Sequence, residues 1–185
     1  MTSKTIAILA LVGIILLLTT TSSNSPEVIY WNGDKRLEWT DFMGQPRFDY
    51  KDISALTSSG IVHYKGCKDG QIIYKVRAYF EKKESWVKIV ARTKHHLEHE
   101  QLHFDITELY ARKLRKALSE KEYKCGQEEE FEAFVGHFLQ DWELSQQKYD
   151  MLTRHSMDKA AQKEWVYKIA MELSLLENYA EQEEE

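Results

Sequence analysis

The chain has 185 residues, of which 43% are hydrophobic and 12% aromatic, and its formal net charge is -5. This length and composition are enough for one compact core and exclude a chain of several ordinary domains. Carboxylates spread along the chain give the acidic balance, and no basic stripe indicates a nucleic-acid partner.

The N-terminus differs from the rest of the chain. Lys4 precedes an uninterrupted apolar run from Ile6 to Leu18, and a segment rich in Thr and Ser follows. This order is typical of a secretory signal. The run is shorter than the roughly 20 residues that cross a bilayer as a helix, which favours a cleaved signal over a retained anchor. We therefore expect residues 1–25 to be a signal peptide or a short membrane anchor that directs export to the periplasm or the extracellular space.

Short apolar runs between turn residues predict strands in the first part of the exported chain, at Val28 to Trp31 and at Leu37 to Trp39. A clearer pair follows. Gly60 to Tyr64 and Ile72 to Phe80 flank the turn Lys68-Asp69-Gly70, and apolar residues alternate along the second run. This pattern predicts a half-buried hairpin.

From about Lys94 the apolar residues recur at helical spacing, which predicts a long helix up to about Lys121. Apolar positions between Phe131 and Tyr149 mark a second helix, and those between Val166 and Leu176 a third. The sequence thus predicts an α+β fold in which an antiparallel sheet precedes a long helix and two further helices.

We expect these elements to form one domain over residues 26–180, followed by a solvated acidic tail at 181–185. Export would bring Cys67 and Cys125 into an oxidising compartment, so a disulfide between them is allowed. Closing that loop would stabilise the fold by roughly 4 kcal/mol on the chain-entropy model. The spacing does not decide between a disulfide and two free thiols.

The predicted long helix carries a motif suited to metal chemistry. His99 and His103 are one helical turn apart, so both imidazoles project from one face and can bind the same ion. Glu100 is rotated about 100° around the helix from His99, near the ion but poorly placed to bind it together with both histidines. This position suits a general base.

Hydrolysis of an amide at neutral pH requires water to lose a proton before it attacks. Zinc lowers the pKa of water from about 15.7 to about 7. Glu100 can accept that proton and later pass it to the leaving amine, a transfer that contributes ~10²- to 10⁴-fold in rate. His95 and His96 precede the motif. His95 lies four residues before His99 and could line the same face, but we expect both residues in a solvated first turn of the helix.

A catalytic zinc site needs a third protein ligand and an open fourth position. Asp105 and Glu108 do not share the face of the two histidines, and His137 is flanked by helical aromatic residues. His155 follows the end of the second predicted helix, where a chain reversal can aim its ring back at the first helix. The sequence offers five candidates for the third ligand, and of these His155 is placed differently from the rest: Asp105, Glu108, His137, Asp150 and His155.

The motif and several other segments resemble the zincin metallopeptidases. They are similar in particular to a bacterial family of uncharacterised, predicted secreted zinc-dependent proteases. The segment from His99 to Ile106 carries the most specific part of the resemblance. The full set of resembling segments is Leu37 to Gly44, Ala55 to Ile61, Ser85 to Val87, His99 to Ile106 and Tyr149 to His155.

The resemblance implies that His99 and His103 bind zinc and that Glu100 is the catalytic base. It also implies that His155 is the third ligand, through the pattern Tyr-Asp-x-x-Thr-x-His. This chain departs from the family at Ser156, where Gly is frequent.

Four further residues have expected supporting roles. Tyr149 is either a phenol donor to the developing oxyanion or a packed helix residue, and these alternatives stay open. Asp150 is expected to orient a ligand histidine. We also expect Asp105 to support the site from behind, and Glu108 either to do the same or to pair with Arg112 in an i,i+4 surface contact.

The sequence therefore predicts an exported zinc-dependent metallopeptidase that acts on a peptide or protein substrate through zinc-activated water. One alternative is a non-catalytic, zinc-stabilised binding module of the envelope or the extracellular space. Another is a metal-independent protein interaction through the helical half.

Overall fold

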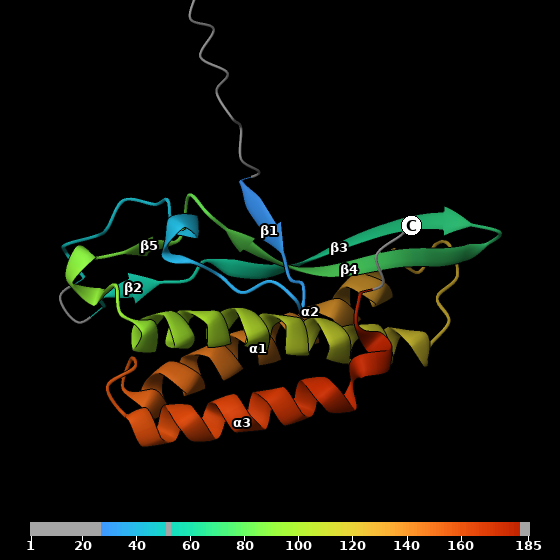
Figure 1. The fold of residues 1–185 in the computed structure, drawn as a ribbon. Helices are drawn as coiled ribbons and strands as arrows, with labels where there is room; N and C mark the ends of the chain where they lie inside the picture. The colour runs from blue at the N-terminus through green and yellow to red at the C-terminus, as the bar shows by residue number, and fades with distance from the viewer. Residues whose placement is uncertain (1–26, 51–52, 182–185) are drawn as a thin grey trace, which may run out of the picture.

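The computed structural model describes residues 27–50 and 53–181 (Figure 1). An antiparallel sheet lies along one side of the central helix α1 (Lys94–Ser119), and two further helices lie along the other sides. The predicted signal or anchor and tail residues 182–185 fall outside the described residues. Within the described ranges, no helix combines the length and apolar character needed to cross a membrane.

Two small antiparallel sheets make up the β part of the fold. The larger has the strand order β1-β4-β3, and the smaller pairs β2 with β5. The α+β class that the sequence predicts is confirmed. The strands are β1 (Val28–Tyr30), β2 (Ala55–Leu56), β3 (Ser59–Lys68), β4 (Gln71–Glu81) and β5 (Trp86–Val87).

Strands β3 and β4 form the predicted hairpin. Lys68 pairs with Gln71 across a two-residue turn. Asp69 and Gly70 in that turn both have positive φ, as a type I′ turn requires. Alternate residues of β4, such as Val76 and Phe80, are buried against α1, because successive side chains of a strand point to opposite faces.

The prediction of a strand at Leu37 to Trp39 is wrong. This stretch is irregular up to a short 3-10 helix, Trp39–Asp41. Its backbone donors find side-chain acceptors, because Leu37 N–H donates to Gln101 Oε1 at 2.7 Å and Glu38 N–H donates to Asp41 Oδ2 at 2.9 Å. These contacts satisfy backbone groups that would otherwise need a neighbouring strand.

The three predicted helices are present as α1, α2 (Glu128–Thr153) and α3 (Lys159–Leu175). Thr93 caps α1 by accepting a hydrogen bond from His96 N–H. One apolar cluster lies between α1 and the sheet, and a second lies between α1 and the other two helices. Helix α1 is therefore buried on several faces, which places its polar motif at the edge of the core.

A disulfide and an ion pair each join parts of the chain that are distant in sequence. Cys67, near the end of β3, forms a disulfide with Cys125 in the segment between α1 and α2. Glu181 forms an ion pair with Arg77 of β4 at 2.6 Å. The expectation of a fully solvated tail is therefore wrong for Glu181, because the basic side chain of Arg77 offers it a partner.

Candidate metal centre

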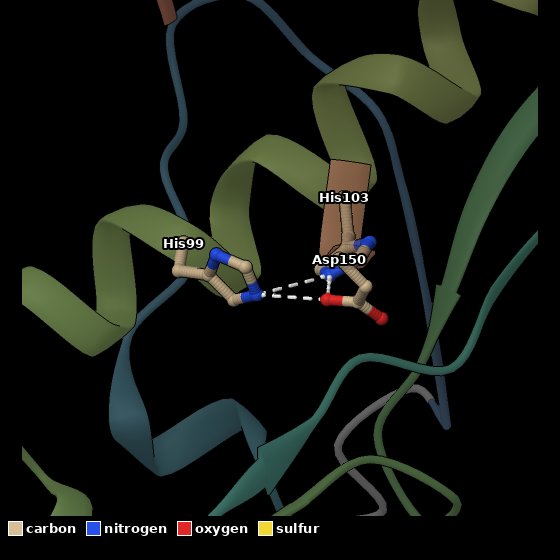
Figure 2. Close-up of side chains that lie close together, drawn as sticks. All are labelled: His99, His103 and Asp150. Carbon is tan, nitrogen blue, oxygen red and sulfur yellow. Dashed lines mark hydrogen bonds and ion pairs between the residues drawn. The ribbon is translucent and has the colours of Figure 1, made fainter. Parts of the chain in front are cut away.

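Three side chains converge where α1 and α2 cross (Figure 2). The Nε2 atoms of His99 and His103 are 3.3 Å apart, and each lies 3.1 Å from Oδ1 of Asp150. Both histidines come from α1, and Asp150 comes from the last turns of α2. Two elements that are distant in sequence thus bring three potential metal ligands together.

The spacing of these three atoms fits a small tetrahedral ion. Zinc binds nitrogen and oxygen at about 2.0–2.2 Å, so its tetrahedral ligands lie about 3.3–3.5 Å from each other. The observed separations of 3.1 to 3.3 Å are close to that value. Imidazole and carboxylate are also common zinc ligands. His99, His103 and Asp150 could therefore hold a zinc ion.

Helical geometry and packing set the direction of the two histidines. The ring of Tyr149 stacks on His99 with centroids 4.6 Å apart and meets His103 edge-on at 4.8 Å. Tyr149 is fully buried, and its hydroxyl donates to the His99 carbonyl at 3.5 Å. It supports the imidazoles from behind and does not line the cleft in front of them.

Gln146 fixes the orientation of His103. The Oε1 atom of Gln146 lies 2.6 Å from His103 Nδ1, and its Nε2 donates to the His103 carbonyl at 2.9 Å. Because an amide oxygen only accepts, His103 Nδ1 carries the hydrogen and Nε2 points at the cluster. Such a partner on the second nitrogen is typical of metal-binding histidines. By contrast, His99 Nδ1 is buried without a hydrogen-bond partner in the described structure.

Asp150 and His103 stabilise each other's charged forms. Burial opposes ionisation of Asp150, but hydrogen bonds from His103 and His99 outweigh it and hold the pKa of the carboxyl well below its usual range. Burial also opposes the charged form of His103, yet the hydrogen bond with Asp150 and the nearby carboxylates raise its pKa. Asp150 is therefore an anion near neutral pH, which suits a ligand for a cation.

Glu100 lies beside the cluster and is 4% exposed. Its Oε2 accepts a hydrogen bond of 2.8 Å from the Thr57 hydroxyl, and the same hydroxyl approaches the Glu100 carbonyl at 3.1 Å. Thr57 thus holds the carboxylate in one orientation. Glu100 has a free lone pair on each oxygen and can accept a proton from a molecule in front of it.

A cleft of about 420 Å³ opens onto both the cluster and Glu100. Three segments line it: residues 53–59 around β2, the first turns of α1, and the second half of α2. His155 and Ser156, which follow α2, close one part of its wall. The potential ligands and the carboxylate therefore face the same accessible space.

The remaining predicted site residues lie at different distances from the cluster. His155 Nδ1 is 3.4 Å from Asp150 Oδ1, so His155 stands beside the cluster without joining the triangle of His99, His103 and Asp150. Asp105 instead accepts from Trp31, Arg36 and Gln101.

Glu108, the other residue expected to support the site, belongs to a separate buried contact group on α1. It binds Arg112 and Arg115. The contacts of Asp105 with Trp31 and Arg36 join α1 to the N-terminal segment, whereas the ion pairs of Glu108 stay within α1. Neither set of contacts reaches the histidine side chains.

Two contact residues were not singled out from the sequence. Gln146 lies one helical turn before Asp150 on the same face of α2, so its spacing was an available signal. Thr57 lies in an irregular stretch, and nothing in its local pattern indicates the contact with Glu100.

Residues 75–156 match one protein family. Its description is a bacterial protein of unknown function (DUF922). The matched segment runs from β4 to the turn after α2 and contains every member of the cluster, Glu100 and His155. No curated protein and no solved structure matches the chain. The expected similarity to an uncharacterised bacterial family is confirmed, while its peptidase activity and a zincin-like fold stay predictions.

Proposed function

We propose that the chain is a zinc-dependent peptidase whose active site is the cleft between α1, α2 and residues 53–59. One observation carries this proposal: three ligand atoms 3.1 to 3.3 Å apart lie in a cleft that also holds the oriented carboxylate of Glu100. A peptide or protein substrate is inferred from the resemblance of the His99-to-His103 motif to zinc metallopeptidases.

In this proposal His99, His103 and Asp150 hold the metal ion. The geometry favours Asp150 as the third ligand, because its Oδ1 completes the triangle with both imidazole nitrogens. The resemblance instead implies His155, which lies next to Asp150. Asp150→Asn and His155→Ala discriminate these assignments. The variant that removes the true third ligand should show the larger fall in zinc affinity, measured by competition with a chelator.

Zinc, when bound, supplies the Lewis acidity that lowers the pKa of water from about 15.7 to about 7. Glu100 accepts the proton at a carboxylate oxygen and donates it to the leaving amine. Thr57 keeps the carboxylate in place by donating to Oε2. Tyr149 has no chemical step in this scheme, since it does not line the cleft and its hydroxyl points at the His99 carbonyl.

The test of catalysis is Glu100→Gln, which keeps the shape of the side chain and removes its basicity. We expect zinc binding within about twofold of wild type and a ~10²- to 10⁴-fold loss of peptide hydrolysis. Glu98→Gln is the matched control, because Glu98 lies on the same helix with a half-exposed side chain paired with Lys94. Wild-type hydrolysis by Glu100→Gln would contradict the proposal.

One observation favours a second candidate, the non-catalytic zinc-stabilised module. His155 Nδ1 lies 3.4 Å from Asp150 Oδ1, so a small movement would offer the ion a fourth side chain and close the site. A structural zinc contributes about 10–16 kcal/mol of binding free energy at pH 7, so chelation would then unfold the domain. In a catalytic site, chelation should abolish hydrolysis while the circular dichroism spectrum keeps its helical signal.

We also propose export to the periplasm or the extracellular space. The apolar run Ile6 to Leu18 is the sequence basis for this proposal. The disulfide between Cys67 and Cys125 supports it, because disulfides persist in oxidising compartments. Fractionation of cells that express the full chain tests the location, and size on a denaturing gel separates a cleaved signal from a retained anchor.

A further inference from the structure

A left-handed turn connects α2 with α3 beside the cluster. Arg154, His155 and Ser156 have φ angles of 52°, 50° and 73°. Side chains disfavour this region of φ and ψ, and a run of such residues persists only where surrounding contacts fix it. The contacts that hold this turn therefore decide where His155 lies.

Ser156 is the buried point of the turn, with 3% of its surface exposed. Its carbonyl lies 2.6 Å from Nε2 of His95, in the first turn of α1. Because a carbonyl only accepts, His95 Nε2 carries the hydrogen and donates it. Gln162 of α3 donates from Nε2 to the His95 carbonyl at 3.3 Å and approaches His95 Nδ1 at 3.5 Å. Helix α3 thus orients His95, and His95 holds Ser156.

The turn at residues 154–156 also positions His155. The His155 N–H donates to the Asp150 carbonyl at 2.9 Å, and the imidazole Nδ1 lies 3.4 Å from the Asp150 carboxylate. The His155 side chain is 47% exposed, so packing in the core does not hold it. Its place beside Asp150 depends on the backbone of the turn.

We propose that His95 is a positioning residue of the metal site. Through the Ser156 carbonyl it fixes the turn at 154–156 and so keeps His155 beside Asp150. The expectation that His95 belongs to a solvated first turn is replaced by this role. The inference rests on the proposed zinc site, and it applies whether His155 binds the ion or holds Asp150.

The test measures the zinc affinity of the full chain by chelator competition, together with the visible spectrum of the cobalt-substituted protein. His95→Leu removes the donor, and we expect it to weaken zinc binding about 10- to 100-fold and to change the cobalt spectrum. His95→Gln keeps a donor and should restore most of the affinity. His137→Leu is the matched control, because His137 is an exposed residue on the part of α2 distant from the cleft.

A double-mutant cycle separates this role from general destabilisation. If His95 acts through His155, then His95→Leu should add almost nothing in a His155→Ala background. Independent effects would multiply, and that result would overturn the proposal. Wild-type affinity in His95→Leu would do the same. Should His95→Leu not fold, His95→Asn takes its place in the cycle, because the shorter side chain withdraws the donor from Ser156.

Ser156→Gly provides an independent check, since glycine adopts a positive φ without steric cost. In the His95→Leu background it should recover part of the zinc affinity, because the turn then depends less on His95. No recovery would count against the proposal. A wild-type protein that binds no zinc contradicts the proposed function itself, whereas normal zinc binding with an additive cycle contradicts only the role of His95.

Discussion

In the proposed zinc site, His103 is the residue at which a proton and the metal ion would compete most directly. Its Nδ1 hydrogen is committed to Gln146, so Nε2 is protonated when it donates to Asp150 and must lose that proton to bind zinc. The pKa of His103 is raised, so protons compete at a higher pH than for an ordinary histidine, whose pKa is about 6.5. The pKa of Asp150 is depressed, so Asp150 does not compete in this range.

We therefore predict that zinc affinity falls about tenfold or more per pH unit below the pKa of His103. Chelator competition between about pH 8 and pH 5 measures this slope. Gln146→Leu removes one hydrogen bond that raises the pKa of His103. In this variant the fall in zinc affinity should therefore begin at a lower pH. A zinc affinity that stays constant across this range would contradict the role of His103 as a ligand.

At the scale of residues, the sequence predicted those site residues that lie close together along the chain. His99, Glu100 and His103 lie within two turns of one helix, so spacing alone places them together. The position of Asp150 depends on how α1 and α2 cross, and the helical period carries no information on that. The contacts of Gln146 depend on the same crossing.

At the scale of elements, a buried ion network fixes α1 against the C-terminal segment. Glu108 accepts from Arg112 and Arg115, and its side chain is 2% exposed. Arg112 also binds Glu177, whose side chain is 73% exposed. Removing a buried partner leaves uncompensated charge, whereas an exposed pair is screened by water.

Glu108→Gln is therefore expected to lower the free energy of unfolding by roughly 3–5 kcal/mol, because the buried guanidinium of Arg112 and the mostly buried one of Arg115 lose their shared buried carboxylate. Glu177→Gln is the matched substitution and should cost less than about 1 kcal/mol. Urea unfolding followed by circular dichroism measures both values. Equal costs would show that burial does not control the strength of this network.

The elements themselves were predicted where a period is long and regular. Helix α1 and the β3–β4 hairpin both have such patterns. The stretch Leu37 to Trp39 was predicted as a strand because it is a short apolar run between polar turn residues. Its backbone instead bonds the side chain of Gln101, and a contact of that range has no signature in the local sequence.

At the scale of the whole molecule, Cys125 of the disulfide follows the C-terminal end of α1, whereas the histidines of the candidate metal site lie in the N-terminal half of that helix. Cys67 and Cys125 are separated by 58 residues in sequence. A bridge that closes a loop of this length contributes roughly 4 kcal/mol on the chain-entropy model, and measured values are typically 2–4 kcal/mol.

Replacing both cysteines with serine should lower the free energy of unfolding by roughly 2–4 kcal/mol. Zinc affinity should stay within about twofold of wild type, since sites that share no partners behave additively. Unfolding in urea and chelator competition on the same preparation measure the two effects. A parallel loss of zinc affinity would show that the two ends of α1 are coupled.

Asp150 belongs to α2, whereas both histidines belong to α1, and this division has a consequence for biosynthesis. A nascent chain that has emerged only as far as α1 presents two imidazoles but no third ligand. With the proposed ligand set, the ion can be captured only after α2 has been made and has docked. Maturation would therefore add the metal to a chain that is already nearly folded, and an incomplete chain would carry no working active site.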